Sequence, residues 1–416
     1  MKKLTKKLVD DYIPSKKVIE NYANIMVNFA LGNGKGIKKG DTVFILGHES
    51  CKPLFMECLK QITKSGGQVI LNYLPDNTDR FGGGKEIMEN STDKQLSWFP
   101  EKYMKGLVDE IDHYLYIISE EDPRALSKIN PKKNMLRQNA MRQFMQWRTE
   151  KENQGKLSWT LCLYPTRAMA QEAGMNLKEY WQQVIGACFL DKKDPITEWK
   201  KVFKIVDIYK NKLNKISPNV DYFHMTGKDC DLKIKLGDNR QWLAGSGCNI
   251  PSFEVFTSPD CRYTEGWIRF NQPLYRYGTL ISDVYLEFKD GKVVKATAKK
   301  GEKVLKEMIA SENADKVGEY SLTDTRCSRI TKFMANTLYD ENVGGPQGNT
   351  HIALGNSYTN TCTLDIKKMQ KKEFEKLGYN FSPVHTDIIS TEKRTVIAKM
   401  KNGTEKLIYR DGEFRL

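Results

Sequence analysis

The chain has 416 residues, of which 39% are hydrophobic and 28% are charged. This length exceeds what one simple core usually covers and predicts two domains of roughly 200 residues each. The composition is that of an ordinary globular protein, and no apolar run approaches the ~20 residues that a membrane-spanning helix needs. We therefore expect a protein with sizeable cores and no membrane partner.

The net charge of +14 is compatible with a protein that binds nucleic acid through Lys and Arg side chains. The charges are interspersed, however, as where Lys200 and Lys201 follow Glu198, and no RNA-binding or zinc-finger signature is present. We interpret the excess charge as a lysine-rich solvated surface and expect no nucleic-acid partner. A basic nucleic-acid-binding protein without catalysis stays open as an alternative.

Nine cysteines are scattered between Cys51 and Cys362 and form no C-x-x-C pair. An odd number without motif spacing favours reduced thiols over a disulfide framework. Residues 1–17 have the basic start of a signal peptide but lack the continuous apolar stretch that should follow. These features predict a cytoplasmic protein.

The N-terminal half alternates between short apolar runs and helical patterns. The expected elements, in chain order, are a strand at Thr42–Leu46, a helix at Pro53–Lys64 and strands at Gln68–Tyr73, Tyr114–Ile118 and Trp159–Leu163. Strands that alternate with helices are typical of βαβ units and a parallel sheet. We therefore predict an α/β domain with a mostly parallel sheet.

A long amphipathic helix at Glu198–Lys215 ends before the breaker sequence Ser217–Asn219. This break predicts an N-terminal α/β domain at residues 1–217 and a second, C-terminal domain at residues 218–416.

The second half is rich in strand patterns. Asp290-Gly291 and Asn402-Gly403 each lie between alternating segments and predict β-hairpins. Helices are expected at Glu302–Ser311 and Arg329–Leu338, so the predicted fold class of this domain is α+β.

The common hydrolase motifs G-x-S-x-G and H-E-x-x-H are absent, but a His–Asp pair is present near the end of the chain. His385 and Asp387 lie two apart in an apolar segment that reads as a strand. Residues two apart on a strand share a face, so their side chains should point the same way. An imidazole nitrogen beside a carboxylate oxygen suits zinc or cobalt.

Three further carboxylates stand where burial without a partner would be costly. Glu254 interrupts an apolar strand, Glu319 follows Val317-Gly318, and Glu341 lies at the end of a predicted helix. Each could instead pair with a Lys or Arg. His351 lies beside another apolar run. Together with His385 and Asp387, these residues supply enough ligands for two metal ions.

These residues also carry a resemblance. The order N-x-P-x-x-E-V-F-T-x-P, V-G-E, D-E-N, H-I-A-L-G-x-x-Y and H-x-D resembles the aminopeptidase T and aminopeptidase S family of metallopeptidases. The matching segments are Asn249–Pro259, Val317–Glu319, Asp340–Asn342, His351–Tyr358 and His385–Asp387, and Pro165–Asp191 is similar to a family segment of the N-terminal half.

The resemblance implies a dimeric exopeptidase that acts on peptides with two divalent metal ions per chain (Zn, Co, Mn or Mg) in an enclosed cavity. The implied ligands are Glu254, Glu319, Glu341, His351, His385 and Asp387, with Tyr358 beside the metals. Phe253 stands where many members have Gly, and Val343–Thr350 lengthens the spacing between Glu341 and His351.

The predicted reaction is hydrolysis of an N-terminal peptide bond by a water that two metal ions activate. We expect Glu319 to bridge the ions, Glu254 to move the proton from water to the leaving amine, and Tyr358 to donate a hydrogen bond to the oxyanion. A non-peptidase dimetal hydrolase of small amides or phosphoesters is the alternative with the same ligands.

Overall fold

The structure is a computed structural model that describes residues 12–76 and 83–416. Most of the basic start considered above therefore lies outside the described residues. Across the part of the chain that is described, no helix is both long and apolar enough to cross a membrane.

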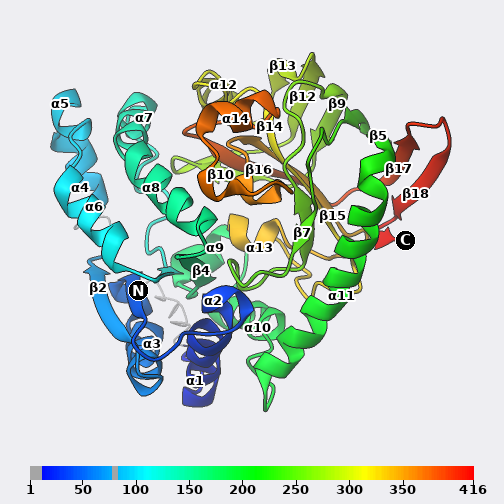
Figure 1. Ribbon diagram of the computed structural model, residues 1–416. Coiled ribbons are helices and arrows are strands. Elements are labelled where there is room, and N and C mark those ends of the chain that lie inside the picture. The colour runs from blue at the N-terminus through cyan, green and yellow to red at the C-terminus, as the bar shows by residue number, and fades with distance from the viewer. Residues whose placement is uncertain (1–11, 77–82) are drawn as a thin grey trace, which may run out of the picture.

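The N-terminal half contains a four-stranded parallel sheet in the order β2-β1-β3-β4 (Figure 1). Its strands are β1 (Thr42–His48), β2 (Gln68–Leu74), β3 (His113–Ile118) and β4 (Ser158–Leu163). All four predicted strands are present and parallel, which confirms the α/β fold class. The runs of β1, β3 and β4 bury most of their side chains, as expected for strands inside a parallel sheet, whereas the edge strand β2 stays partly exposed at Leu71 and Tyr73.

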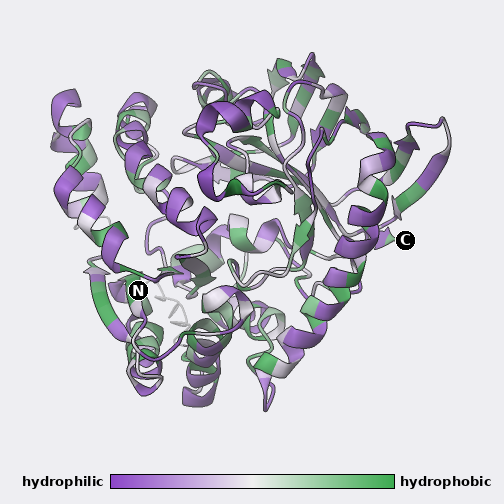
Figure 2. Cartoon of the chain, viewed as in Figure 1, coloured by the Kyte–Doolittle hydropathy of each residue, from purple (hydrophilic) through white to green (hydrophobic). Residues whose placement is uncertain are grey.

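The N-terminal half also contains several helices. They are α1 (Lys16–Ile25), a π-helical turn (Met26–Ala30), α2 (Leu31–Gly34), α3 (Lys52–Lys64), α4 (Gly83–Asn90), α5 (Asp93–Leu96), α6 (Glu101–Glu110), α7 (Pro131–Ala140), α8 (Arg142–Asn153), α9 (Arg167–Glu172), α10 (Leu177–Ala187) and α11 (Pro195–Ile216). The predicted helices α3 and α11 are confirmed. By contrast α7 and α8 bury only Asn134 and Phe144 and are largely hydrophilic (Figure 2).

The C-terminal half is built on antiparallel sheets. An eight-stranded sheet has the order β13-β12-β9-β6-β5-β17-β18-β19, a five-stranded sheet has the order β16-β15-β14-β8-β7, and β10 pairs with β11. Their bounds are β5 (Val220–Gly227), β6 (Cys230–Ile234), β7 (Leu243–Ala244), β8 (Glu254–Thr257), β9 (Glu265–Phe270), β10 (Leu274–Arg276), β11 (Thr279–Ile281), β12 (Val284–Lys289), β13 (Lys292–Thr297), β14 (Val317–Thr323), β15 (Asn349–Gly355), β16 (His385–Ser390), β17 (Thr395–Met400), β18 (Glu405–Arg410) and β19 (Glu413–Phe414).

Both predicted hairpins form. β12 pairs with β13 across Asp290-Gly291, whose φ angles are 50° and 75°, and β17 pairs with β18 across the turn that contains Gly403. Positive φ at two successive turn residues matches the right-handed twist of the flanking strands. The short helices here are α12 (Glu302–Ile309), α13 (Thr337–Asp340) and α14 (Lys371–Lys376), and single 3-10 turns occupy Glu49–Cys51, Ser217–Asn219, Thr359–Thr361 and Ile366–Lys368.

The predicted helix at Arg329–Leu338 is wrong, because only α13 forms in this region. The Asp340 carboxylate accepts hydrogen bonds from the backbone N–H groups of Met334 (2.6 Å) and Asn336 (2.9 Å). Ala335 has a φ of 52°, which a right-handed helix excludes. A buried aspartate therefore folds this segment into a loop that an apolar pattern alone cannot foresee.

One large core contains buried residues of both halves. Within the C-terminal half, this core fills the space between the two large sheets. Tyr320, on one face of the five-stranded sheet, packs against Trp242, and Trp242 packs against Phe223 of the eight-stranded sheet, with ring centroids 5.7 and 5.5 Å apart. The parallel sheet precedes α11 and the antiparallel sheets follow it, in agreement with a boundary after residue 217. The division into two domains there stays a prediction, since buried residues of both halves belong to one cluster.

Candidate metal centre

The opposite face of the five-stranded sheet carries the candidate ligands. In the strand register Thr323 pairs with Glu254, Ser321 with His351, and Ala353 with both Glu319 and Asp387. Directly paired residues of antiparallel strands point to the same face, and so do residues two apart along a strand. The register therefore gathers on one face Glu254 of β8, Glu319 of β14, His351 of β15, and His385 and Asp387 of β16.

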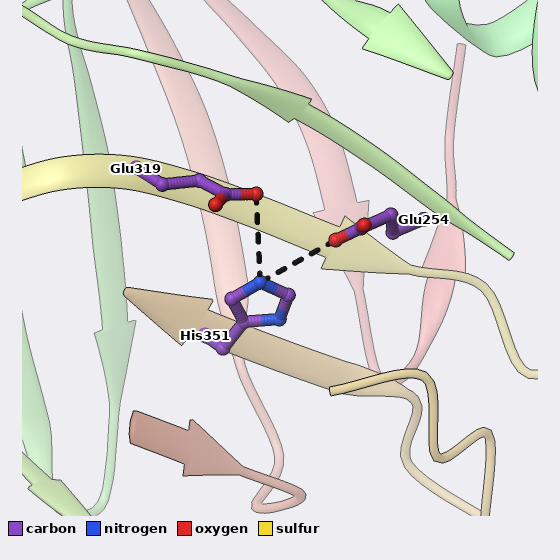
Figure 3. Close-up of side chains that lie close together, drawn as sticks. All are labelled: Glu254, Glu319 and His351. Carbon is purple, nitrogen blue, oxygen red and sulfur yellow. Dashed lines mark ion pairs between the residues drawn. The ribbon is translucent and has the colours of Figure 1, made fainter. Parts of the chain in front are cut away.

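The first group of ligand atoms surrounds His351. Its Nε2 atom lies 3.4 Å from Oε2 of Glu254 and 3.7 Å from Oε1 of Glu319, and both carboxylates point toward this nitrogen (Figure 3). Glu254, Glu319 and His351 are all buried, with exposed fractions of 6%, 3% and 1%. One ligand atom from each lies within 4.8 Å of the others, a spacing that one metal ion can span.

The second group surrounds His385. Its Nε2 atom lies 3.2 Å from Oε2 of Glu319 and 3.5 Å from Oδ1 of Asp387. Nδ1 of His385 lies 2.8 Å from the backbone carbonyl of Asn356, to which it must donate. That bond leaves Nε2 as the free ligand atom, as a metal-binding histidine requires. The structure thus confirms that the side chains of His385 and Asp387 share a face.

Glu341 follows α13 and is buried, but it belongs to neither group. The side-chain amides of Asn249 and Asn342 donate to its Oε1 atom at 3.0 and 3.3 Å. Burial, reinforced by the charges of Glu254, Asp387 and Glu319, raises the pKa of Glu341 well above its ordinary value, so Glu341 lies near the same cluster.

Tyr358 lies beside the second group. Its ring centroid is 4.8 Å from that of His385, and its backbone N–H donates to Oγ of Ser258 at 2.8 Å. Burial, reinforced by the charge of Glu319, raises the pKa of the Tyr358 hydroxyl well above its ordinary value. The hydroxyl therefore stays protonated and able to donate.

The buried carboxylates of the cluster create a negative environment that favours bound positive charge, either protons or metal ions. Burial raises the pKa of Glu254 to about 7, and the charge of Glu319 adds to the rise. Burial opposes the charged form of His351, but its hydrogen bond with Glu319 and the charge of Glu254 outweigh this and raise its pKa to about 9. Burial likewise opposes the charged form of His385, but the charge of Asp387 raises its pKa well above the ordinary value.

The donor set fits divalent metal ions. Four carboxylates and two imidazoles converge, and within residues 12–76 and 83–416 the ion-pair partners of Glu254, Glu319 and Asp387 are histidines alone. For the described part of the chain, the alternative that Glu254 or Glu319 forms an ion pair with a Lys or Arg side chain is therefore wrong. Oxygen and imidazole nitrogen ligands suit zinc, cobalt and manganese.

Sequence reasoning missed the residues that hold the ligands in place. Ser321 donates to Oε2 of Glu254 at 2.7 Å, and the carbonyl of Asn356 orients His385. Ser321 lies two residues after Glu319 on the same strand, so strand alternation could have identified it. Asn356 acts through its backbone, which leaves no signal in the sequence.

Phe253, the departure from the family pattern, is 1% exposed. Its ring stacks on Trp199 of α11 with a centroid distance of 5.3 Å and an interplanar angle of 27°. Its backbone N–H donates to Oδ1 of Asn342 at 2.6 Å. Phe253 therefore anchors the start of β8 against the N-terminal half.

Comparisons with known proteins find relatives that match most of this chain. Aminopeptidase PepS of Streptococcus thermophilus is 26% identical over 424 residues, which cover 96% of this chain and 98% of that protein. Aminopeptidase T of Thermus aquaticus is 27% identical over 347 residues, covering 79% of this chain and 82% of that protein. A solved structure of wild-type AmpT from Thermus thermophilus has the same fold, with a TM-score of 0.80 at 22% identity over 96% of this chain and 100% of that chain.

The family described as thermophilic metalloprotease (M29) matches residues 15–414, which include the whole described metal cluster. This match confirms the resemblance that the five motifs predicted. With nearly the full length covered and the ligand cluster assembled on one sheet face, the chain belongs to the M29 family of metalloproteases.

Proposed function

We propose that this protein is a metal-dependent aminopeptidase whose residues Glu254, Glu319, Glu341, His351, His385 and Asp387 hold two divalent metal ions. The observation that carries the proposal is the shared position of Glu319: its Oε1 faces His351 and its Oε2 faces His385. A carboxylate that offers one oxygen to each of two ligand groups is suited to bridge two ions. The names of the relatives supply the aminopeptidase part of the proposal.

Two ions bound there would polarise the scissile carbonyl and lower the pKa of a water molecule. Around them, the chain positions its own groups for proton transfer and charge stabilisation. Ser321 occupies Oε2 of Glu254, so Oε1 is the atom that we assign to carrying a proton from water to the leaving amine. The protonated hydroxyl of Tyr358 would donate to the developing oxyanion.

The test compares a free peptide with its N-acetylated form, each incubated with chelator-treated and metal-restored protein. We expect removal of the first residue from the free peptide only after Zn, Co or Mn is restored, and no cleavage of the acetylated form. Mass spectrometry reads the products. Internal cuts, or equal cleavage of both peptides, would contradict an aminopeptidase. Faster turnover of p-nitrophenyl phosphate than of an amino-acid p-nitroanilide would favour the alternative dimetal hydrolase.

The proposal also includes a cytoplasmic homodimer, as the family resemblance implies. The nine cysteines are all free and eight of them are buried, which suits a reducing compartment. Sedimentation equilibrium should give a mass of about twice that of one chain. A monomer that retains full activity would contradict the proposed homodimer without contradicting the proposed metal centre.

A further inference from the structure

One contact between the N-terminal half and the metal cluster runs through the backbone of Asn249. Strand β4 lies at the edge of the parallel sheet, and Leu161 forms a parallel bridge with Asn249. The N–H of Leu161 donates to the carbonyl of Cys248 at 2.8 Å, and the N–H of Ile250 donates to the carbonyl of Leu161 at 3.0 Å. The backbone of Asn249 is therefore fixed by the sheet of the other half.

Whereas the backbone of Asn249 lies against strand β4, its side chain points toward Glu341 of the metal cluster. Its Nδ2 atom donates to Oε1 of Glu341 at 3.0 Å. A carboxylate only accepts hydrogen bonds, so the amide must present its nitrogen here. Asn342 donates to the same oxygen at 3.3 Å, and no hydrogen bond among the described residues reaches Oε2 of Glu341. Two donors on Oε1 leave Oε2 as the oxygen that is available to a metal ion.

We propose that Asn249 is a positioning residue through which the N-terminal half sets the orientation of the Glu341 carboxylate, and with it the metal affinity of the centre. This inference rests on the proposed function, in which Glu341 is a ligand. It assigns to the N-terminal half a direct part in holding the metal centre. Partners that orient a ligand typically contribute about 10- to 100-fold to metal affinity.

The test measures the zinc affinity of purified full-length protein by competition with a chromophoric chelator. The variants are Asn249→Ala, Glu341→Gln and the double variant. We expect Asn249→Ala to weaken one of the two sites by about tenfold or more. If Asn249 acts only through Glu341, the same substitution should change affinity by less than about twofold in the Glu341→Gln background.

Two further variants keep the test decisive. Asn249→Leu has a similar size and removes the donor without adding a charge, so it should lose about as much affinity as Asn249→Ala without leaving a cavity. Asn214→Ala is the matched control, because Asn214 also joins the two halves, through hydrogen bonds with Trp242 at 3.0 and 2.7 Å, but contacts no carboxylate of the centre. It should leave zinc affinity within about twofold of wild type.

Hydrogen–deuterium exchange gives a second measurement that is independent of catalysis. Coupling between two sites is reciprocal, so zinc loading should slow exchange at the amides of Leu161 and Ile250. That slowing should be absent in Asn249→Ala. Thermal unfolding of the metal-free variants establishes that they fold.

The possible results distinguish the assignment of Glu341 as a metal ligand from the positioning role of Asn249. If Glu341→Gln loses affinity while Asn249→Ala and Asn249→Leu keep it, the inference is overturned and the proposed ligand set stands. Losses that add in the double variant also overturn it. If Glu341→Gln itself keeps wild-type affinity for both ions, the ligand set fails at Glu341 and the inference fails with it.

Discussion

Oε2 of Glu319 lies 3.2 Å from Nε2 of His385, although strand β15 runs between their strands β14 and β16. The two side chains meet across β15 because the residues beneath them are small. Ala353 is paired with Glu319 on one side, and Gly355 is paired with His385 on the other. The floor of the candidate centre is therefore the methyl group of Ala353 and the backbone of Gly355, and no larger side chain separates Glu319 from His385.

Glu319 should be required for both metal ions. We expect wild-type protein to bind two divalent ions per chain and Glu319→Gln, which keeps the shape but loses the charge, to bind neither tightly. His351→Ala and His385→Ala should each lose one ion, since each contacts one group of ligands. Elemental analysis after metal loading and gel filtration measures the stoichiometry. A consistent value of one ion or none per chain in wild-type protein would contradict the proposal of a two-metal centre.

Ala353→Val should reduce metal binding by filling the floor of the centre. Ala353 is fully buried, and added methyl groups would project between Glu319 and Asp387. Overpacking of this kind costs about 1–3 kcal/mol, so the protein should still fold. The control is Ile352→Val on the opposite face, which should cost about 0.5–1.5 kcal/mol of stability without changing metal content. Equal metal loss in the two variants would show that the effect is global.

Activity should depend on alternate residues of β16. His385→Ala and Asp387→Ala should each reduce turnover by about 10²-fold or more, because each removes a ligand from a charge-stabilising centre. Thr386→Ala should retain most turnover, since Thr386 points to the other face of the sheet. Steady-state kinetics on an amino-acid p-nitroanilide measures this pattern. A loss in Thr386→Ala that matched its neighbours would refute the assignment of faces.

Asp41 should stabilise the N-terminal half in a pH-dependent manner. Burial would raise its pKa, but hydrogen bonds from His113 and from the backbone N–H of Lys38 outweigh that and hold it below the ordinary 3.8. A lowered folded-state pKa contributes stability above pH 3.8 that is lost as the pH falls through the folded value. Asp41→Asn should therefore cost about 1–3 kcal/mol at pH 7 and less at pH 3.5.

Chemical denaturation of the metal-free protein at the two pH values measures this difference. Asp109→Asn is the control, because Asp109 pairs with Lys105 on the surface, where both side chains are about half exposed. Exposed ion pairs contribute little, so this variant should differ from wild type by less than about 0.5 kcal/mol at either pH. A constant cost of Asp41→Asn across the two pH values would contradict the linkage.

The sequence alone determined the alternation of strands and helices, both hairpins and the residues that are candidate metal ligands. These features are local: a run such as Thr42–Leu46 is apolar over its whole length, and Asp290-Gly291 supplies the positive φ angles of its own turn. The pairing of His385 with Asp387 is local as well, because strand alternation fixes which side chains share a face.

Only the tertiary structure decided how the candidate ligands divide into two groups around Glu319. Glu254, Glu319, His351 and His385 are far apart in the chain, and their distances follow from the order β16-β15-β14-β8 and from the register of each pair. The loop at residues 329–336 has the same origin, since the buried carboxylate of Asp340 supplies hydrogen bonds that a local pattern does not contain. Contacts between distant segments depend on packing and register, which no single stretch of sequence encodes.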